Sequence, residues 1–69
     1  MSKMILGQKY QVKRLNGQRI TFQFWGDMNN VNDACEIIES NTTELPVGKL
    51  ISLDELLATP YVQMDKIFL

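Results

Sequence analysis

The sequence predicts a mainly β domain of the α+β class, in which five short strands form a small sheet and one short helix precedes the last strand. Three features indicate this fold. Apolar and polar residues alternate at residues 8–14 and 18–25, an Asn-Gly pair at 16–17 separates these runs, and residues 52–55 have the pattern of a helix start. Alternation with a period of two is typical of a strand that buries one face.

The first two strands form a hairpin that can pair in two ways. A two-residue loop at 16–17 would place the apolar rows of the two strands on opposite faces. A three-residue loop at 15–17, with Gly17 left-handed in a G1 bulge, places Val12 opposite Ile20 and keeps the apolar side chains on one face. We predict the second pairing, because the register of a half-buried hairpin follows its apolar pattern.

The opposite face of this hairpin is polar and basic. Its charged residues are Lys9, Lys13 and Arg19, and Trp25 lies at its end. Such a face is either solvated, with Trp25 tucked under a loop, or it is a contact surface on which cations meet anionic groups and the indole ring stacks or anchors. Lys9, Lys13, Arg19 and Trp25 are therefore the candidate residues for binding a partner or an anionic ligand.

Residues 27–33 are rich in Asn and Asp and predict a mobile loop beside Trp25, because these side chains compete with regular backbone hydrogen bonding. Their spacing does not match a calcium loop. Residues 34–40 and 45–51 predict the third and fourth strands, and a proline and a glycine within 45–51 indicate a sheet edge or a bend.

The helix is predicted from a capping box, in which Ser52 caps the first turn and Glu55 returns the bond. It should last about two turns and end before Pro60. Residues 61–69 predict the last strand, which ends in Ile67, Phe68 and Leu69 and is apolar on both faces there. Either residues 4–6 or a second chain should cover this end, so these three residues are candidates for self-association.

This order of elements is analogous to that of an SH3-like barrel, which also carries a short helix before its last strand. The analogy concerns element order and is no family match. An OB-fold, with its helix between the third and fourth strands, ranks second, and a mixed sheet with one packed helix ranks third. None of these folds establishes a function.

Length and composition narrow the chemistry. We expect the 69 residues to form a single domain, 1–69, that lacks histidine and has Cys35 as its only cysteine. Zinc, cofactors and the usual general base are therefore not expected. Cys35 should be a small core residue, and Asp54 and Glu55 should be first-turn helix acids, which the helix dipole favours. No enzyme is predicted, and a lone cysteine without a signal-peptide pattern favours a cytoplasmic location without membrane insertion.

The charges are unevenly distributed although the net charge is −1. Residues 1–19 carry five positive charges and no acid, whereas residues 20–69 carry two positive and eight negative charges, a balance of −6. Three explanations are open: a basic ligand-binding face, contact between the basic hairpin of one copy and an acidic surface of another, or internal pairing across neighbouring strands.

These features favour a small non-enzymatic interaction module that self-associates into a homo-oligomer and binds a protein partner as an accessory regulator or inhibitor. The alternative is a small β-barrel that binds nucleic acid or a nucleotide through the basic hairpin face. The isoelectric point of about 5.1 weighs against this alternative, since nucleic-acid binders are normally basic. The third hypothesis is a purely structural subunit or a small-molecule binder at a subunit interface.

Overall fold

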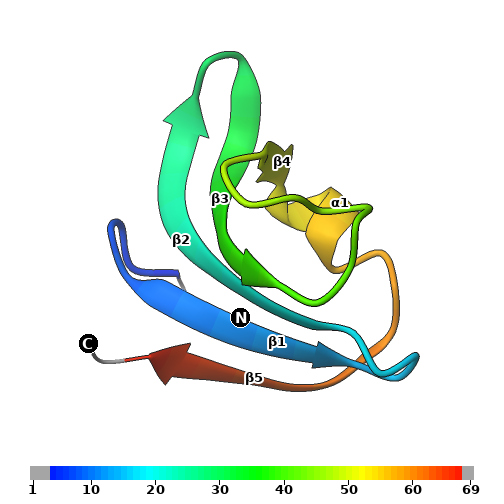
Figure 1. The fold of residues 1–69 in the computed structure, drawn as a ribbon. Helices are drawn as coiled ribbons and strands as arrows, with labels where there is room; N and C mark the ends of the chain where they lie inside the picture. The colour runs from blue at the N-terminus through cyan, green and yellow to red at the C-terminus, as the bar shows by residue number, and fades with distance from the viewer. Residues whose placement is uncertain (1–3, 68–69) are drawn as a thin grey trace.

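The computed structural model describes residues 4–67, which form five strands and one short helix (Figure 1). In chain order the elements are β1 (Lys9–Arg14), β2 (Arg19–Met28), β3 (Val31–Ser40), β4 (Leu50–Ser52), α1 (Leu53–Leu56) and β5 (Tyr61–Ile67). All paired strands are antiparallel and lie in one sheet in the order β4-β3-β2-β1-β5. The predicted five-stranded antiparallel sheet with one short helix before the last strand is confirmed.

The hairpin of β1 and β2 has the predicted register. Val12 pairs with Ile20, and Tyr10 pairs with Phe22, so the apolar rows share one face. The rings of Tyr10 and Phe22 are stacked, with their centroids 5.7 Å apart. Gly17 has a φ of 91°, as the three-residue loop requires.

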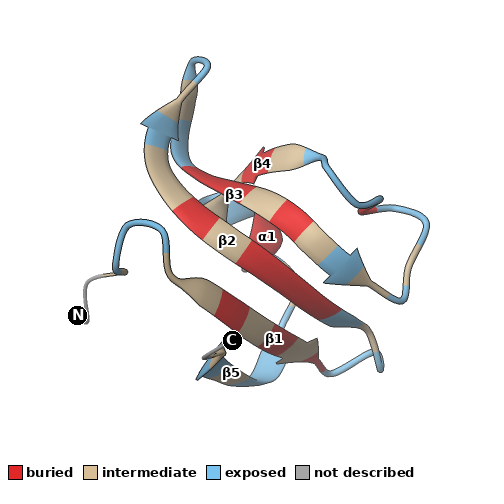
Figure 2. Ribbon diagram, turned by 60° about the vertical axis from the view of Figure 1, so that its left-hand side comes forward, coloured by how far each residue is buried: buried red, intermediate tan, exposed pale blue. Residues whose placement is uncertain are grey.

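The core lies on the side of the curled sheet that faces α1 (Figures 1 and 2). Strands β1, β2 and β3 supply most of it, and β4, α1 and the chain before β4 close it. The buried residues of this core are Tyr10, Val12, Ile20, Phe22, Phe24, Cys35, Ile37, Leu45, Ile51 and Leu56. The prediction that Cys35 and Ile37 face inward is confirmed.

The predicted loop at 27–33 is wrong, because β2 and β3 continue as a hairpin joined by a two-residue turn at Asn29 and Asn30. These two residues have φ values of 50° and 65°, as a type I′ turn requires and asparagine tolerates. Gly26, at φ 69°, lies between two register shifts, and such bulges let the ladder continue past residues that resemble a loop. Since β1 pairs with β2 only as far as Gln23, this hairpin projects beyond the rest of the sheet (Figure 1).

The fourth strand is shorter than the predicted 45–51, because only Leu50–Ser52 pairs regularly with β3. Residues 46–49 form a turn that Lys49 N closes on the carbonyl of Pro46, although Leu45 before it is buried. The interruption arises because proline cannot donate to a ladder and Gly48 adopts a φ of 92°.

Helix α1 begins where it was predicted, and the Ser52 side chain accepts a 3.2 Å hydrogen bond from the backbone N of Glu55. It lasts one turn and not two. The reason lies at its end, where Ala58 N bonds back by only three residues to the carbonyl of Glu55, which tightens the last turn before Pro60. Among the described residues, no helix is long and apolar enough to span a membrane.

Strand β5 lies at one edge of the sheet beside β1. Met64 pairs with Val12 and packs against the core, but a register shift between Lys13 and Arg14 leaves Val62 without a partner in β1. As a result Val62 is 68% exposed. Residues 4–6, the predicted cover for the last strand, contact β1 and β2: Ile5 N donates a 2.9 Å hydrogen bond to the hydroxyl of Tyr10, and the Leu6 side chain lies against Gly26.

Candidate interaction surface

The face of the sheet opposite the core, called here the outer face, carries the predicted binding residues. The register aligns its side chains in rows that cross several strands. Reading from β5 toward β3, these rows are Ile67, Lys9, Gln23 and Glu36; Asp65, Gln11, Thr21 and Glu39; and Gln63, Lys13 and Arg19. Cations therefore occupy β1 and β2, and carboxylates occupy the strands that flank this pair, β3 and β5.

Lys13 and Arg19 lie directly opposite each other on β1 and β2. Two like charges in this position repel, so the sheet itself gains nothing from them. Lys9 is placed between Gln23 and Ile67, and the register sets no carboxylate directly opposite any of the three cations. Direct cross-strand pairing therefore does not account for the charge asymmetry of the sequence.

Trp25 lies far from this pair of cations. It follows Arg19 by six positions on β2, which corresponds to about 20 Å along a strand. Trp25 is half-buried, and its indole Nε1 donates a 2.9 Å hydrogen bond to Oε1 of Glu36 on β3. The structure thus brings Lys13 and Arg19 together, but it places Lys9 and Trp25 toward the other end of the outer face.

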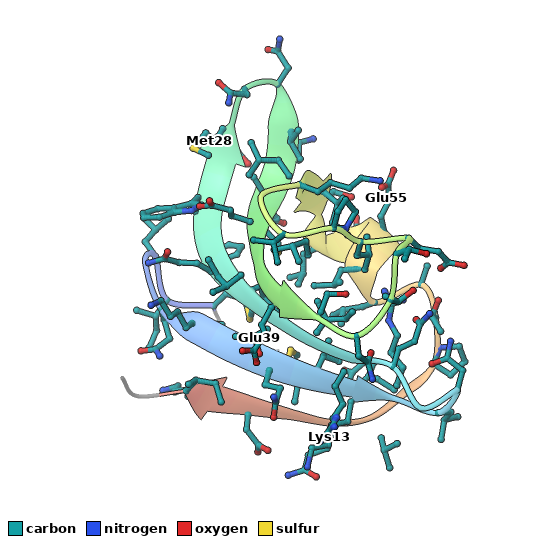
Figure 3. The ribbon with its side chains drawn as sticks, in the orientation of Figure 1. Lys13, Met28, Glu39 and Glu55 are labelled. Carbon is teal, nitrogen blue, oxygen red and sulfur yellow. The ribbon has the colours of Figure 1, made fainter. Side chains whose placement is uncertain are left out.

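A polar pocket of about 310 Å³ lies on the outer face where β1, β2 and β3 meet. It is lined by Gln11, Arg19, Thr21, Glu39, Ser40 and Asn41. In Figure 3 the carboxylate of Glu39 reaches from β3 toward β1. The lining offers one guanidinium, one carboxylate, amides and hydroxyls, a set suited to hydrogen bonding with a mixed-charge polar surface.

Sequence reasoning did not identify the role of Arg14, which is buried on the core side and only 6% exposed. Its Nη1 donates to Oε1 of Gln18 at 2.8 Å, and its Nη2 donates to the carbonyl of Leu56 at 2.7 Å. Arg14 follows Tyr10 and Val12 at alternate positions of β1, so its side chain points to the same inward face, and the alternation of the strand alone would have placed it there. Its contacts join the end of β1 to the end of α1.

A second missed feature is an exposed apolar cluster at the corner where the β1–β2 turn meets the start of β5. Leu15 N donates a 3.0 Å hydrogen bond to the carbonyl of Pro60, and Arg14 pairs with Tyr61. This holds Leu15, Pro60, Tyr61 and Val62 together, and we call them the corner patch. Leu15 and Val62 are each 68% exposed, and Tyr61 is 42% exposed.

The predicted self-association residues are only partly within the described chain. Ile67 is half-buried, pairs with Lys9, and its carbonyl accepts a 3.0 Å hydrogen bond from Nε2 of Gln8. Phe68 and Leu69 lie outside the described residues. The role assigned to these three residues stays a prediction.

Two observations on the described residues concern metal binding and the thiol of Cys35. Between residues 4 and 67, no three His, Cys, Asp or Glu side chains are placed to hold a metal ion together. Burial, with a further contribution from the charge of Asp33, raises the pKa of Cys35 from 9.0 to about 12. A thiol with this pKa is protonated at neutral pH and is a poor nucleophile.

Comparisons with protein families, with curated proteins and with solved structures found no match.

Proposed function

We propose that the chain is a small non-enzymatic module that binds a protein partner through its outer face, as an accessory regulator or inhibitor. The observation that carries this proposal is the alternation of charge across that face. Cations on β1 and β2 are flanked by carboxylates on β3 and β5, and a polar pocket containing both Arg19 and Glu39 lies between them. A surface of mixed sign complements another protein better than it complements a uniformly anionic polymer.

We also propose that the curled sheet corresponds to an SH3-like barrel. The support is the element order, the single helical turn before β5, and the length of β2, whose ten residues bend across the molecule and pair with both β1 and β3. Register shifts along β2 and β3 favour such bending. Small barrels of this type serve many functions, so the fold adds no partner by itself.

Site-specific photo-crosslinking tests the proposed partner binding. A photoreactive amino acid is placed at Gln11, which lines the pocket, and in a matched variant at Glu55, which is exposed on α1 and lies away from Glu39 of the pocket in Figure 3. In the cells that produce the protein, we expect the variant at position 11 to yield a discrete crosslinked protein that Arg19→Glu removes. Equal crosslinking from both positions, or none from position 11, would count against the proposal.

The opposed cations Lys13 and Arg19 favour a second candidate function, the binding of nucleic acid or a nucleotide. This hypothesis predicts that a fluorescein-labelled oligonucleotide binds at low salt and that its affinity falls steeply as salt is added. Lys13→Glu should weaken the binding measured at low salt. Affinity that does not change with salt would exclude this function. The nearby carboxylates of Glu39 and Asp65 weigh against it because they repel phosphates.

A further inference from the structure

The corner patch adjoins the opposed cations of the outer face. Lys13 precedes Arg14 and Leu15 in the chain, and it pairs with Gln63, the residue after Val62. Exposed apolar side chains with a polar rim are typical of a protein contact site, and the rim on this side is cationic. The complementary surface should therefore be apolar with carboxylates beside it.

The chain itself carries such a surface at the tip of the β2–β3 hairpin, residues 27–33, which we call the acidic tip. Asp27 and Asp33 are both exposed and lie together, because the backbone N of Asp33 donates a 3.1 Å hydrogen bond to Oδ1 of Asp27. Between them Met28 pairs with Val31, and both side chains remain partly exposed. Two neighbouring carboxylates with two apolar side chains match the two opposed cations and the apolar cluster at the corner.

One molecule cannot make this contact with itself. The acidic tip projects from one end of the sheet, and Figure 3 shows Met28 and Lys13 at opposite ends of the molecule. A two-fold contact of patch on patch is also unfavourable, because it would bring Lys13 and Arg19 of one copy against the same cations of the other. A head-to-tail arrangement avoids this repulsion, because the acidic tip of each copy meets the corner patch of the next.

We infer that a second copy of this chain docks its acidic tip on the corner patch, so that the protein self-associates head to tail. The apolar side chains of the tip cover Leu15, Tyr61 and Val62, and the two aspartates face Lys13 and Arg19. This inference rests on the proposed interaction module and names one of its partners, a further copy, through residues other than those predicted from the sequence for self-association. A heterologous contact of this kind forms a ring if the rotation closes and an open chain if it does not.

Two variants that each remove one side of the contact test it by sedimentation velocity at up to millimolar concentration. The patch variant combines Arg19→Glu with Val62→Glu. The tip variant combines Asp27→Asn with Asp33→Asn, because asparagine keeps the hydrogen-bond acceptor at 27 and tolerates the φ of 50° at 33. Val47→Glu is the matched control, since Val47 is also 68% exposed but lies outside both surfaces.

We expect the wild type and Val47→Glu to associate, and each double variant alone to remain at the chain mass of 8.0 kDa, with self-affinity weakened at least about tenfold. Mixing the two double variants should restore a one-to-one dimer and nothing larger, because only one intact tip and one intact patch can then meet. If the patch variant does not fold, Arg19→Glu alone replaces it, because Arg19 is exposed and its reversal of charge should weaken self-association by itself.

A monomeric wild type, unchanged association of either variant, or a mixture that stays monomeric would each overturn the head-to-tail contact. The proposed binding of a different protein is judged separately by crosslinking from position 11. A monomeric wild type that still crosslinks there refutes only self-association.

Discussion

The guanidinium of Arg14 donates a 2.7 Å hydrogen bond from Nη2 to the carbonyl of Leu56, the last residue of α1. This bond is buried and joins residues 42 positions apart in the chain. A cation at the end of a helix is favoured by the orphan carbonyls there, and in this structure the cation comes from a strand. Arg14 thus connects the basic hairpin to the only described helix.

Replacing Arg14 by methionine should therefore lower the free energy of unfolding by about 1–3 kcal/mol. The backbone carbonyl of Leu56 and the side-chain oxygen Oε1 of Gln18 would each lose the guanidinium as a hydrogen-bond donor. Urea denaturation measures the change. Arg19→Met, at an exposed position, should change stability by less than about 0.5 kcal/mol. An Arg14→Met variant as stable as the wild type would contradict this account. It would mean that the free energy lost by burying the guanidinium, whose Nε has no partner, equals the free energy gained from its two hydrogen bonds.

The helix cap provides a second stability prediction. Ser52→Ala removes the acceptor for the backbone N of Glu55 and should destabilise the protein by about 1 kcal/mol. Ser52→Asp keeps an acceptor at the N-cap and should retain most of the stability. Thermal unfolding followed by circular dichroism compares the two, and equal losses in both variants would show that the hydroxyl acts through packing and not as a cap.

The turn of the first hairpin depends on the backbone freedom of Gly17. A Cβ at this position would meet no atom within 4 Å, so the cost of Gly17→Ala is conformational and not steric crowding. The φ of 91° should make that cost about 1–2 kcal/mol. Gly17→Asn should cost less, because asparagine visits the left-handed region more readily; an alanine variant as stable as the asparagine variant would contradict this account.

The parts of the fold that the sequence predicts well are those in which local signals agree with the tertiary structure. The hairpin register follows from the apolar rows that include Val12 and Ile20, because a slip by one residue would expose one of them. The cap at Ser52 follows from local hydrogen bonding, which needs no information from distant residues.

The failures occur where tertiary pairing overrides local preference. Residues 27–33 resemble a loop, yet strand pairing extends to a tight turn at Asn29 and Asn30, because bulges absorb the irregular residues. The candidate site was only half predicted for a similar reason. Lys13 and Arg19 could be placed on one face by alternation, but the corner patch joins Leu15 to Pro60, and no local pattern indicates that contact.

The last prediction concerns the contribution of Cys35 to the dependence of stability on pH in the alkaline range. Burial raises the pKa of this thiol from 9.0 to about 12 in the folded protein, whereas the unfolded chain should titrate near the ordinary value of 9.0. Between these values the unfolded state loses the proton and the native state keeps it. The free energy of unfolding should therefore be unaffected by Cys35 below pH 8 and fall above pH 9, by up to about 1.4 kcal/mol per pH unit.

Cys35→Ala is the control, because it lacks the thiol but keeps every other titrating group. Its unfolding free energy, measured by urea denaturation at intervals from pH 7 to pH 11, should be lower than that of the wild type at neutral pH, since the smaller side chain leaves a cavity in the core. The difference between the two proteins should shrink as the pH rises, because only the wild type loses stability through the thiol. A constant difference across this range would mean that the native thiol ionises as readily as the unfolded one.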